Sequence, residues 1–355
     1  MKANICVLPG DGIGVEVIDA TLPVLEKAAK GFSLEFRHYP AGAQHYAKTG
    51  DALPEATFAA AKAADAILFG AMGWPEIRYP DGTEIAPQLD LRFRLNLYAG
   101  VRPVRAIPGV PVALADPRAR DMDLVILRES TEGLFAARGR GEVIGDSEAR
   151  DTMVITRATT ERLSRFAFRL AERRAARLGR PQKVTLVDKA NVFTSMAFMR
   201  KVFREVAAEF PGVPAGEHYV DAMALDLVRR PWDFDVLPME NMFGDILSDL
   251  GAGLIGGMGY APSADIGDTH AVFQPSHGTG PDIAGKGVAN PTAMLLSTAL
   301  MLDWLGSRGA GQGWTDASTE LEAAVDGAFA DGLRSAEFGG VGTAEIARAV
   351  AGRIP

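Results

Sequence analysis

Apolar residues occur along the chain in two alternating patterns, as short runs and as longer stretches with helical spacing. The short runs predict strands at Ala3–Leu8, Leu34–Tyr39, Ala66–Phe69, Leu124–Leu127, Val184–Val187 and Asp235–Met239. Helical spacing predicts helices over Val15–Lys30, Pro54–Ala63, Thr159–Leu178, Ser195–Phe210, Ala222–Val228, Asp245–Leu254 and Pro291–Leu305. This alternation predicts an α/β protein with mainly parallel sheets, whose active site lies where strands end and helices begin.

The length of the chain favours two domains. Its 355 residues exceed what one small hydrophobic core holds and suit two α/β domains. The segment Ala136–Met153 is interrupted by glycines and has neither helical spacing nor core character, so we expect a hairpin or arm protruding from the second domain. The glycine-rich segment Gly306–Trp314 predicts a surface loop before a final pair of helices.

Composition indicates a globular protein without a membrane partner. Hydrophobic residues make up 47% of the chain, yet no run reaches the roughly 20 apolar residues that cross a bilayer. The apolar N-terminus leads into a glycine-rich turn, which predicts a first strand rather than a signal peptide. Cys6 is the single cysteine; it excludes intrachain disulfides, argues against zinc–thiolate sites and fits a buried thiol in a cytoplasmic enzyme.

The charge distribution argues against nucleic acid as a partner. The formal net charge is −8, and no basic face is evident that could replace counterions on phosphates. The Arg-rich run Arg162–Arg180 is the local exception. Its apolar positions keep helical spacing, so we interpret it as the solvated face of a helix.

The first motif with chemical potential is the turn Leu8–Gly14, with glycines at 10, 12 and 14. It follows a strand and opens a helix, as a dinucleotide fingerprint would. The glycine spacing does not match G-x-G-x-x-G, because position 15 is Val15. Taken alone, the motif favours a tight strand-to-helix turn.

The second motif is a pair of aspartates at the start of a predicted helix. Asp245 and Asp249 are four residues apart, so their carboxylates project from one helix face and repel each other unless a cation lies beside them. A helix N-terminus that favours acids would explain Asp245 but not Asp249. The pair therefore predicts a divalent metal site, and all-oxygen ligands favour Mg²⁺ or Mn²⁺ over zinc.

The third motif places Lys189 directly after an apolar strand. At the carboxyl end of that strand its ammonium can be partly desolvated, which suits a general base. An ion pair with the neighbouring Asp188 is an equally good interpretation of this fragment. Asp221 repeats the pattern, because another strand end presents a carboxylate there.

Two further features are ambiguous on their own. Arginines at 92, 94, 102 and 128 could grip a di- or tricarboxylate with their guanidinium forks, or could form ordinary surface ion pairs. The polar, glycine-dense loop His277–Pro291 could lay backbone amides against a nucleotide, with Asp282 accepting from ribose hydroxyls. It could equally be a long connection between domains.

Taken together, these motifs resemble one family, the β-decarboxylating dehydrogenases, which include isopropylmalate, isocitrate, homoisocitrate and tartrate/D-malate dehydrogenases. The resemblance covers nearly the whole chain and follows the family's order. The matching motifs are LPGDGIG from residue 8, VDKAN from 187, HYVDAMA from 218, NMFGDILSD from 241 and HGTGPDIAGKGVANP from 277. It implies a first, cofactor-binding domain built from residues 1–98 and 256–355, and a middle domain over 99–255 that carries the dimer surface and the arm.

The resemblance also implies roles for individual positions. Arg92, Arg102 and Arg128 are similar to the arginines that hold the malate-like part of the substrate. Asp221, Asp245 and Asp249 resemble the ligands of Mg²⁺ or Mn²⁺, and Lys189 resembles the base that takes the hydroxyl proton. In the family, Lys189 and Asp221 come from the partner subunit of a homodimer. Residues similar to the cofactor site are Ile13, His277, Gly278, Thr279, Gly280, Asp282, Ile283 and Asn290. Asp282 is typical of an NAD site, because an acidic residue repels the 2′-phosphate of NADP.

The implied reaction is NAD-linked oxidation of a 2-hydroxy di- or tricarboxylic acid, followed by decarboxylation. One departure from the family is Phe135, which replaces a tyrosine that helps protonate the enol. A phenyl ring has no proton to give, so we expect weakened decarboxylation or enol protonation, unless water or another side chain replaces the hydroxyl.

A second departure lies before Arg92, where Gln88 and Leu89 stand in place of the paired leucines of isopropylmalate dehydrogenases. A glutamine in an apolar pocket needs a polar partner, which predicts a substituent more polar than isopropyl, such as hydroxyl or carboxylate. Arg94 adds a cation nearby, as in homoisocitrate-type sequences. Two alternatives remain: a 3-isopropylmalate dehydrogenase of leucine biosynthesis, and a catalytically silent subunit of a hetero-oligomer.

Overall fold

The computed structural model describes residues 2–355 and divides them into two compact units. Unit 1 comprises the chain up to Asn96, the short segment Ile107–Ala113 and the chain from Ile255 onward. Unit 2 comprises Leu97–Ala106 and Leu114–Leu254.

Unit 1 contains five strands in the order β2-β1-β3-β12-β11. They are β1 (Lys2–Gly10), β2 (Ser33–His38), β3 (Ala66–Ala71), β11 (Pro262–Ile266) and β12 (Ala271–Pro275). All neighbouring pairs are parallel except β11 and β12. β3 is buried along its whole length, as the apolar run at Ala66–Phe69 predicts for a strand covered on both faces.

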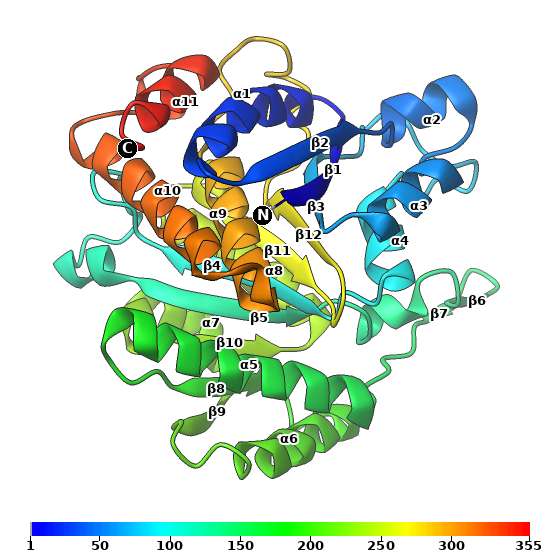
Figure 1. The fold of residues 1–355 in the computed structure, drawn as a ribbon. Helices are drawn as coiled ribbons and strands as arrows, with labels where there is room; N and C mark the ends of the chain where they lie inside the picture. The colour runs from blue at the N-terminus through cyan, green and yellow to red at the C-terminus, as the bar shows by residue number, and fades with distance from the viewer. Residues whose placement is uncertain (1) are drawn as a thin grey trace. The chain divides into compact units, whose positions relative to one another are not determined.

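The helices of unit 1 pack around these strands. They are α1 (Ile13–Ala28), α2 (Ala43–Thr49), α3 (Glu55–Ala63), α4 (Pro87–Arg94), α9 (Thr292–Leu305), α10 (Gln312–Ala330) and α11 (Thr343–Ala351). α9 is apolar almost all round; it packs on β11 and β12 and is covered in turn by α10 (Figure 1). A helix without a polar face is stable only when buried on all sides.

The prediction of a surface loop over Gly306–Trp314, followed by a final pair of helices, is confirmed in part. Residues 307–309 are exposed, and α10 and α11 follow. The segment is more helical than predicted, because a π-helical turn over Gly306–Ala310, interrupted by a left-handed Gly309, follows α9, and α10 already begins at Gln312. Trp314 is fully buried and stacks on Phe32 with ring centroids 4.4 Å apart. Burying a large aromatic side chain such as Trp314 stabilises the fold by more free energy than ordering the neighbouring glycines costs in conformational entropy.

Unit 2 contains five strands in the order β4-β5-β10-β8-β9. They are β4 (Ala99–Arg105), β5 (Asp123–Glu129), β8 (Val184–Asp188), β9 (Ala215–Tyr219) and β10 (Val236–Met239). Only the β4–β5 pair is antiparallel. A separate hairpin of β6 (Glu142–Ile144) and β7 (Glu148–Arg150) extends from the rest of the unit with every residue exposed (Figure 1).

Four long helices complete unit 2: α5 (Arg157–Leu178), α6 (Thr194–Ala207), α7 (Val220–Arg229) and α8 (Asn241–Leu254). α5 packs against α6 and β10, while α8 packs against β5, β4 and α7. Leu163, Ala167, Phe168 and Ala171 of α5 are buried, and Arg165 forms an ion pair with Glu209 at the surface. The Arg-rich stretch is thus largely the solvated helix face that the sequence predicts, except for Arg174, which is buried and pairs with Asp123 at 2.9 Å.

The α/β class with mainly parallel strands is confirmed, and each of the six strands and seven helices predicted from apolar patterns has a counterpart. The pattern missed β4, which carries two arginines and a proline, and β11, which carries a buried aspartate. It also missed β12. In the described part of the chain, no helix is long and apolar enough to cross a membrane. Cys6 is a buried free thiol, as predicted, and burial raises its pKa to about 12.

Candidate active site

In unit 2, an arginine at the end of β5 meets an aspartate in α8. The guanidinium of Arg128 is buried and forms an ion pair with the Asp245 carboxylate, which is half exposed. Its Nε also donates to the Asn241 side-chain oxygen at 2.9 Å. Asn241 begins α8, so one arginine links the carboxyl end of a strand to the first turn of the helix that carries both predicted acids.

Asp249 follows one turn later on the same helix. Burial raises its pKa, and the negative charge of Asp245 raises it further, while Arg102 and Arg128 act in the opposite direction. A divalent cation relieves the repulsion between two neighbouring carboxylates. Oxygen donors of this kind fit Mg²⁺ or Mn²⁺. Asp245 and Asp249 therefore fit a metal, and Arg102 and Arg128 lie close enough to influence the same carboxylate.

A third acidic ligand does not join this pair. Among the described residues, no three His, Cys, Asp or Glu side chains are grouped closely enough to hold a metal. Asp221, in the first turn of α7, instead accepts a hydrogen bond from Lys189 Nζ at 2.6 Å. That bond lowers the pKa of the Asp221 carboxyl group. One copy of the chain thus separates the predicted site into a two-acid part and a lysine–aspartate part.

The surroundings of Lys189 decide between the two interpretations of its motif. Asp188 is fully buried and is occupied by Arg200, whose Nε and Nη atoms donate to it at 2.8 and 2.6 Å. Lys189 points to Asp221 instead, with its side chain 24% exposed. The ring of Tyr219 lies between the two cations, 5.9 Å from Lys189 Nζ and 5.0 Å from the Arg200 guanidinium carbon. The Lys189 side chain is therefore partly desolvated, and it forms no ion pair with the neighbouring Asp188, which binds Arg200.

Phe135 lies beside the same arginine that contacts α8. It belongs to a short 3-10 turn, Leu134–Ala137, and its ring centroid is 4.9 Å from the Arg128 guanidinium carbon. The turn is fixed by Glu240, which accepts from the backbone N–H of Leu134 at 3.1 Å. The phenyl ring thus lies next to a predicted substrate arginine, without a hydroxyl group.

In unit 1, α4 carries the other predicted substrate contacts. Arg92 is buried, and its Nε donates to the Asp265 carboxylate of β11 at 3.0 Å. One turn earlier on α4, Gln88 has its Oε1 buried without a hydrogen-bond partner, and Leu89 next to it is half-buried. Arg94 turns to α3, where it pairs with the exposed Glu55 and covers the ring of Phe58.

The loop that follows β12 carries the predicted cofactor contacts. The His277 ring makes a 2.9 Å hydrogen bond to the Gly278 carbonyl through Nδ1, so Nδ1 is the donor and Nε2 an acceptor. Nε2 is buried without a partner, and burial lowers the pKa of the imidazole, which keeps it neutral. An orphaned acceptor of this kind fits a ligand that offers an N–H or O–H group, as a nucleotide does.

The same loop is tied to the turn after β1. The Ile13 N–H donates to the Thr279 carbonyl at 2.8 Å. Gly12 has φ +55°, and a Cβ there would lie 2.2 Å from that carbonyl oxygen. Only glycine allows the two segments to approach so closely.

The other predicted cofactor residues occupy different parts of the loop. Asp282 is exposed, Ile283 is half-buried, and Gly280 lies against Ile13. Asn290 accepts from the N–H and hydroxyl of Thr292, the first residue of α9. Asn290 therefore has a structural partner at the start of a helix, whereas Asp282 is open to a ligand.

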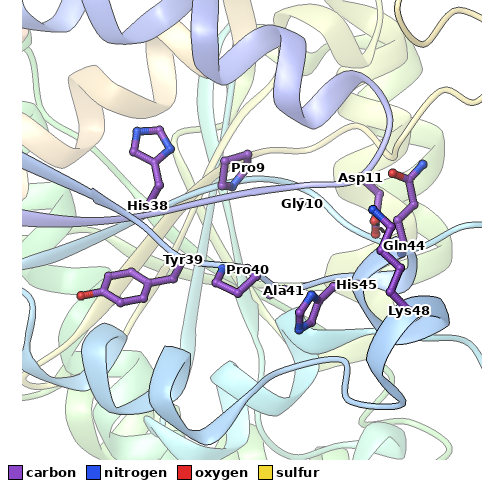
Figure 2. Close-up of a pocket in the computed structure, with 10 residues that line it drawn as sticks. All are labelled: Pro9, Gly10, Asp11, His38, Tyr39, Pro40, Ala41, Gln44, His45 and Lys48. Carbon is purple, nitrogen blue, oxygen red and sulfur yellow. Dashed lines mark hydrogen bonds between the residues drawn. The ribbon is translucent and has the colours of Figure 1, made fainter.

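A cavity of about 330 Å³ also lies in unit 1, between the turn after β1 and the connection from β2 to α2 (Figure 2). Asp11 and Gln44 lie at one end of it, and His38 and Tyr39 at the other. Asp11 is fully buried and accepts backbone N–H groups from Ala43, Gln44 and Gly73. None of the predicted cofactor residues lines this cavity.

Sequence reasoning missed the residues that hold the predicted arginines. Asn241 binds Arg128, and Asp265 binds Arg92. Gln274 supports the second pair by donating to Asp265 at 2.8 Å. The signal for Asp265 was present, since an isolated acid inside an otherwise apolar segment requires a buried partner. Asn241 had no signal of its own beyond its place before a helix.

Known proteins resemble the chain along its full length. A model of the family described as isocitrate/isopropylmalate dehydrogenase matches residues 4–350. A 3-isopropylmalate/3-methylmalate dehydrogenase from Methanocaldococcus jannaschii is 44% identical, over 99% of this chain and 98% of that protein. An isocitrate/homoisocitrate dehydrogenase from Thermus thermophilus is also 44% identical, over 97% and 96%.

Solved structures agree with the sequence relatives. An isocitrate dehydrogenase from Methylococcus capsulatus superposes with a TM-score of 0.85 at 37% identity, covering 99% of both chains. A β-decarboxylating dehydrogenase from Thermococcus kodakarensis gives 0.80 at 37% identity, covering 99% of this chain and 96% of that one. The chain is a dehydrogenase and belongs to the isocitrate/isopropylmalate dehydrogenase family.

Proposed function

We propose that the protein oxidises a 2-hydroxy di- or tricarboxylic acid with a malate-like core, using NAD and Mg²⁺ or Mn²⁺, and that decarboxylation follows. The observation that carries the proposal is the pair Asp245 and Asp249 beside the guanidinium groups of Arg102 and Arg128. Acids for a cation and arginines for carboxylates are the two recognition elements that a metal-chelated hydroxy acid requires.

Each residue in this proposal has a distinct task. Arg92, Arg102 and Arg128 are the proposed contacts for carboxylates of the substrate. Asp245, Asp249 and Asp221 would hold a divalent cation, which would supply positive charge against a deprotonated hydroxyl group and an enolate. Lys189 would act as the general base that accepts the proton of the substrate hydroxyl, and the residues of the cofactor loop would hold NAD, which would supply the hydride acceptor.

The cofactor loop supports NAD as the hydride acceptor. The neutral His277 presents an unpaired Nε2 acceptor, and Asp282 is exposed on the loop. A carboxylate there can accept from ribose hydroxyls and would repel a 2′-phosphate. The remaining contacts are Ile13, Gly278, Thr279, Gly280, Ile283 and Asn290.

A homodimer completes the site in this proposal. Asp221 and Lys189 are not grouped with the Asp245–Asp249 pair in one chain, so a second copy supplies them. Two contacting helices of unit 2 carry large exposed apolar side chains: Leu225 and Val228 of α7 are 56% and 47% exposed, and Ile246 of α8 is 60% exposed. Apolar side chains gathered on one face favour burial against an identical face.

The substituent on the substrate separates two candidate functions. The buried, unpaired Oε1 of Gln88 favours a group that donates a hydrogen bond, such as a hydroxyl. Three of the relatives with 40–44% identity carry isopropylmalate in their names, which favours 3-isopropylmalate. We place a polar substituent first, because an apolar group would leave that oxygen unsatisfied.

Assays of the purified chain with NAD and Mn²⁺ test the proposal. The panel contains D-malate, tartrate, isocitrate, homoisocitrate and 3-isopropylmalate. NADH formation with one of the polar acids, abolished by EDTA and restored by Mn²⁺, is the expected result. A higher kcat/KM for 3-isopropylmalate than for every polar acid would establish the alternative. No NADH from any acid would favour a silent subunit, although Lys189 and all three aspartates are present.

A further inference from the structure

The segment from His277 to Asn290 is attached to the first turn of α1 at two points, in addition to the 3.2 Å hydrogen bond that the Asn290 side chain donates to Glu337. At the first point, the Ile13 N–H donates to Thr279. At the second, the Glu16 carboxylate accepts from the N–H groups of Ala289 at 3.0 Å and Gly287 at 3.4 Å. Ile13 and Glu16 are three residues apart, so one helical turn holds both ends of the loop.

The second attachment also involves the start of α11. The Thr343 hydroxyl contacts the Glu16 carboxylate and lies 2.6 Å from the Ala289 carbonyl, and the Thr343 N–H donates to the Gly287 carbonyl at 3.0 Å. Glu16 and Thr343 together satisfy the backbone N–H and C=O groups of both loop residues. Of the two loop residues, Ala289 is buried and Gly287 is exposed. Paired backbone groups at a loop end leave that end little freedom to move.

Between these attachments, the loop bonds mainly to itself. Ile283 and Ala284 donate to the Gly280 carbonyl, and Lys286 donates to the Ile283 carbonyl. Asp282 lies on this self-bonded part and is exposed. Its position therefore depends on where the two ends of the loop are fixed.

We propose that Glu16 and Thr343 are positioning residues for cofactor binding, which act through the backbone of Gly287 and Ala289. This inference rests on the proposed role of the loop in binding NAD. Losing either side chain weakens the attachment at this end of the loop, because only the backbone bond from Thr343 to Gly287 and the bonds of the other side chain remain. The adenosine side of the cofactor must then order the loop on binding. Substrate contacts on Arg102 and Arg128 remain as they are, and the KM for NAD changes selectively.

The test compares two replacements of Thr343. Thr343→Val removes the hydroxyl and keeps the shape, whereas Thr343→Ser keeps the hydroxyl. Glu16→Ala removes the carboxylate, and Glu26→Gln, on the exposed side of α1, serves as the matched control. Three quantities are measured: the NADH Kd by fluorescence without substrate, the KM values for NAD and hydroxy acid, and amide hydrogen exchange of the cofactor-free chain over 280–290.

We expect Thr343→Val and Glu16→Ala to raise the NADH Kd and the KM for NAD by ~10-fold. Exchange over 280–290 should become faster, with the KM for the hydroxy acid unchanged. Thr343→Ser and Glu26→Gln should match the wild type. Faster exchange with an unchanged NADH Kd, or equal effects of Val and Ser at 343, would overturn the inference. A wild-type chain that binds no NADH would instead refute the proposed cofactor, because the comparison among variants would have no binding to alter.

Discussion

Lys189 and Asp221 form an ion pair with an N–O distance of 2.6 Å; Lys189 directly follows β8, and Asp221 lies in the first turn of α7, which follows β9. Among the described residues, Asp221 is not grouped with Asp245 and Asp249 as a third potential metal ligand. In one chain Asp221 is paired with Lys189 and not with the two acids of α8. This separation leads to a direct test of shared sites.

Mixing two inactive variants should restore activity if the sites are shared. Lys189→Ala and Asp245→Asn each abolish turnover as homodimers. In a mixed dimer, one of the two sites combines an intact Asp245 with an intact Lys189. After unfolding and refolding an equimolar mixture, random pairing gives about a quarter of wild-type NADH production, since half of the dimers are mixed and each has one intact site. Failure to recover any activity from folded, mixed dimers would contradict shared sites.

The acid pair on α8 predicts a loss of metal affinity in Asp249→Asn. This change removes a carboxyl group whose pKa is raised by burial and by the neighbouring charge of Asp245, a charge balance that a bound cation would improve. We expect the Kd for Mn²⁺, measured by calorimetry, to rise by at least ~10-fold. Asp233→Asn, a carboxylate on an exposed turn, is the control. An unchanged Mn²⁺ affinity in Asp249→Asn would remove Asp249 from the ligand set.

Phe135 predicts that oxidation and CO₂ release are not equally fast. The ring lies beside Arg128 and cannot donate a proton, so NADH should form faster than CO₂ in the wild type. Phe135→Tyr should raise the ratio of CO₂ to NADH toward one. Phe198→Tyr is the matched control, because the ring of Phe198 on α6 also lies against an arginine, Arg157 of α5. Equal amounts of both products at a fast turnover in the wild type would refute this prediction, and Phe135→Tyr would then change little.

Gln88→Leu should shift the preference among substrates. The buried Oε1 of Gln88 has no partner in the described part of the chain, and leucine removes that unsatisfied acceptor. We expect the ratio of kcat/KM for 3-isopropylmalate to that for a hydroxyl-substituted malate to rise by roughly 10-fold or more. Gln44→Leu, on α2, controls for a general effect of the substitution. A wild type that already prefers 3-isopropylmalate would exclude a polar subsite at Gln88.

Glu129 predicts a pH dependence of stability. Burial raises the pKa of its carboxyl group from 4.5 to about 7, despite hydrogen bonds from Thr131 and Glu132 that oppose the shift. Because the folded-state pKa is the higher one, the folded state holds more protons between these values. The stabilisation is complete below pH 4.5 and is lost as the pH rises through 7. In Glu129→Gln, the free energy of unfolding should therefore fall less between pH 5 and 8 than in the wild type.

Urea titrations at several pH values measure this slope. Glu142→Gln, on the exposed hairpin, should keep the wild-type slope. The absolute stability of Glu129→Gln is expected to be lower, because the amide nitrogen cannot accept the hydrogen bonds that the carboxylate accepts. Parallel slopes in wild type and Glu129→Gln would show that Glu129 does not titrate in this range.

The sequence predicted most of the fold because apolar spacing reports burial directly. It located the acid pair of α8 as well, since i and i+4 acids on one helix face need no tertiary information. It could not predict which carboxylate forms the ion pair with Lys189. That depends on Arg200, which belongs to the following helix α6 and binds Asp188. Nor could it find Asp265 as the partner of Arg92, since 173 residues separate the two.

The close approach at Gly12 has a consequence for how the protein can vary. A side chain at this position would meet the Thr279 carbonyl, so the turn after β1 and the loop after β12 cannot change independently. Insertions or deletions in either segment would have to be matched by the other, although more than 260 positions lie between them in the gene product. Variants designed to change cofactor preference should therefore replace the turn after β1 and the loop after β12 together.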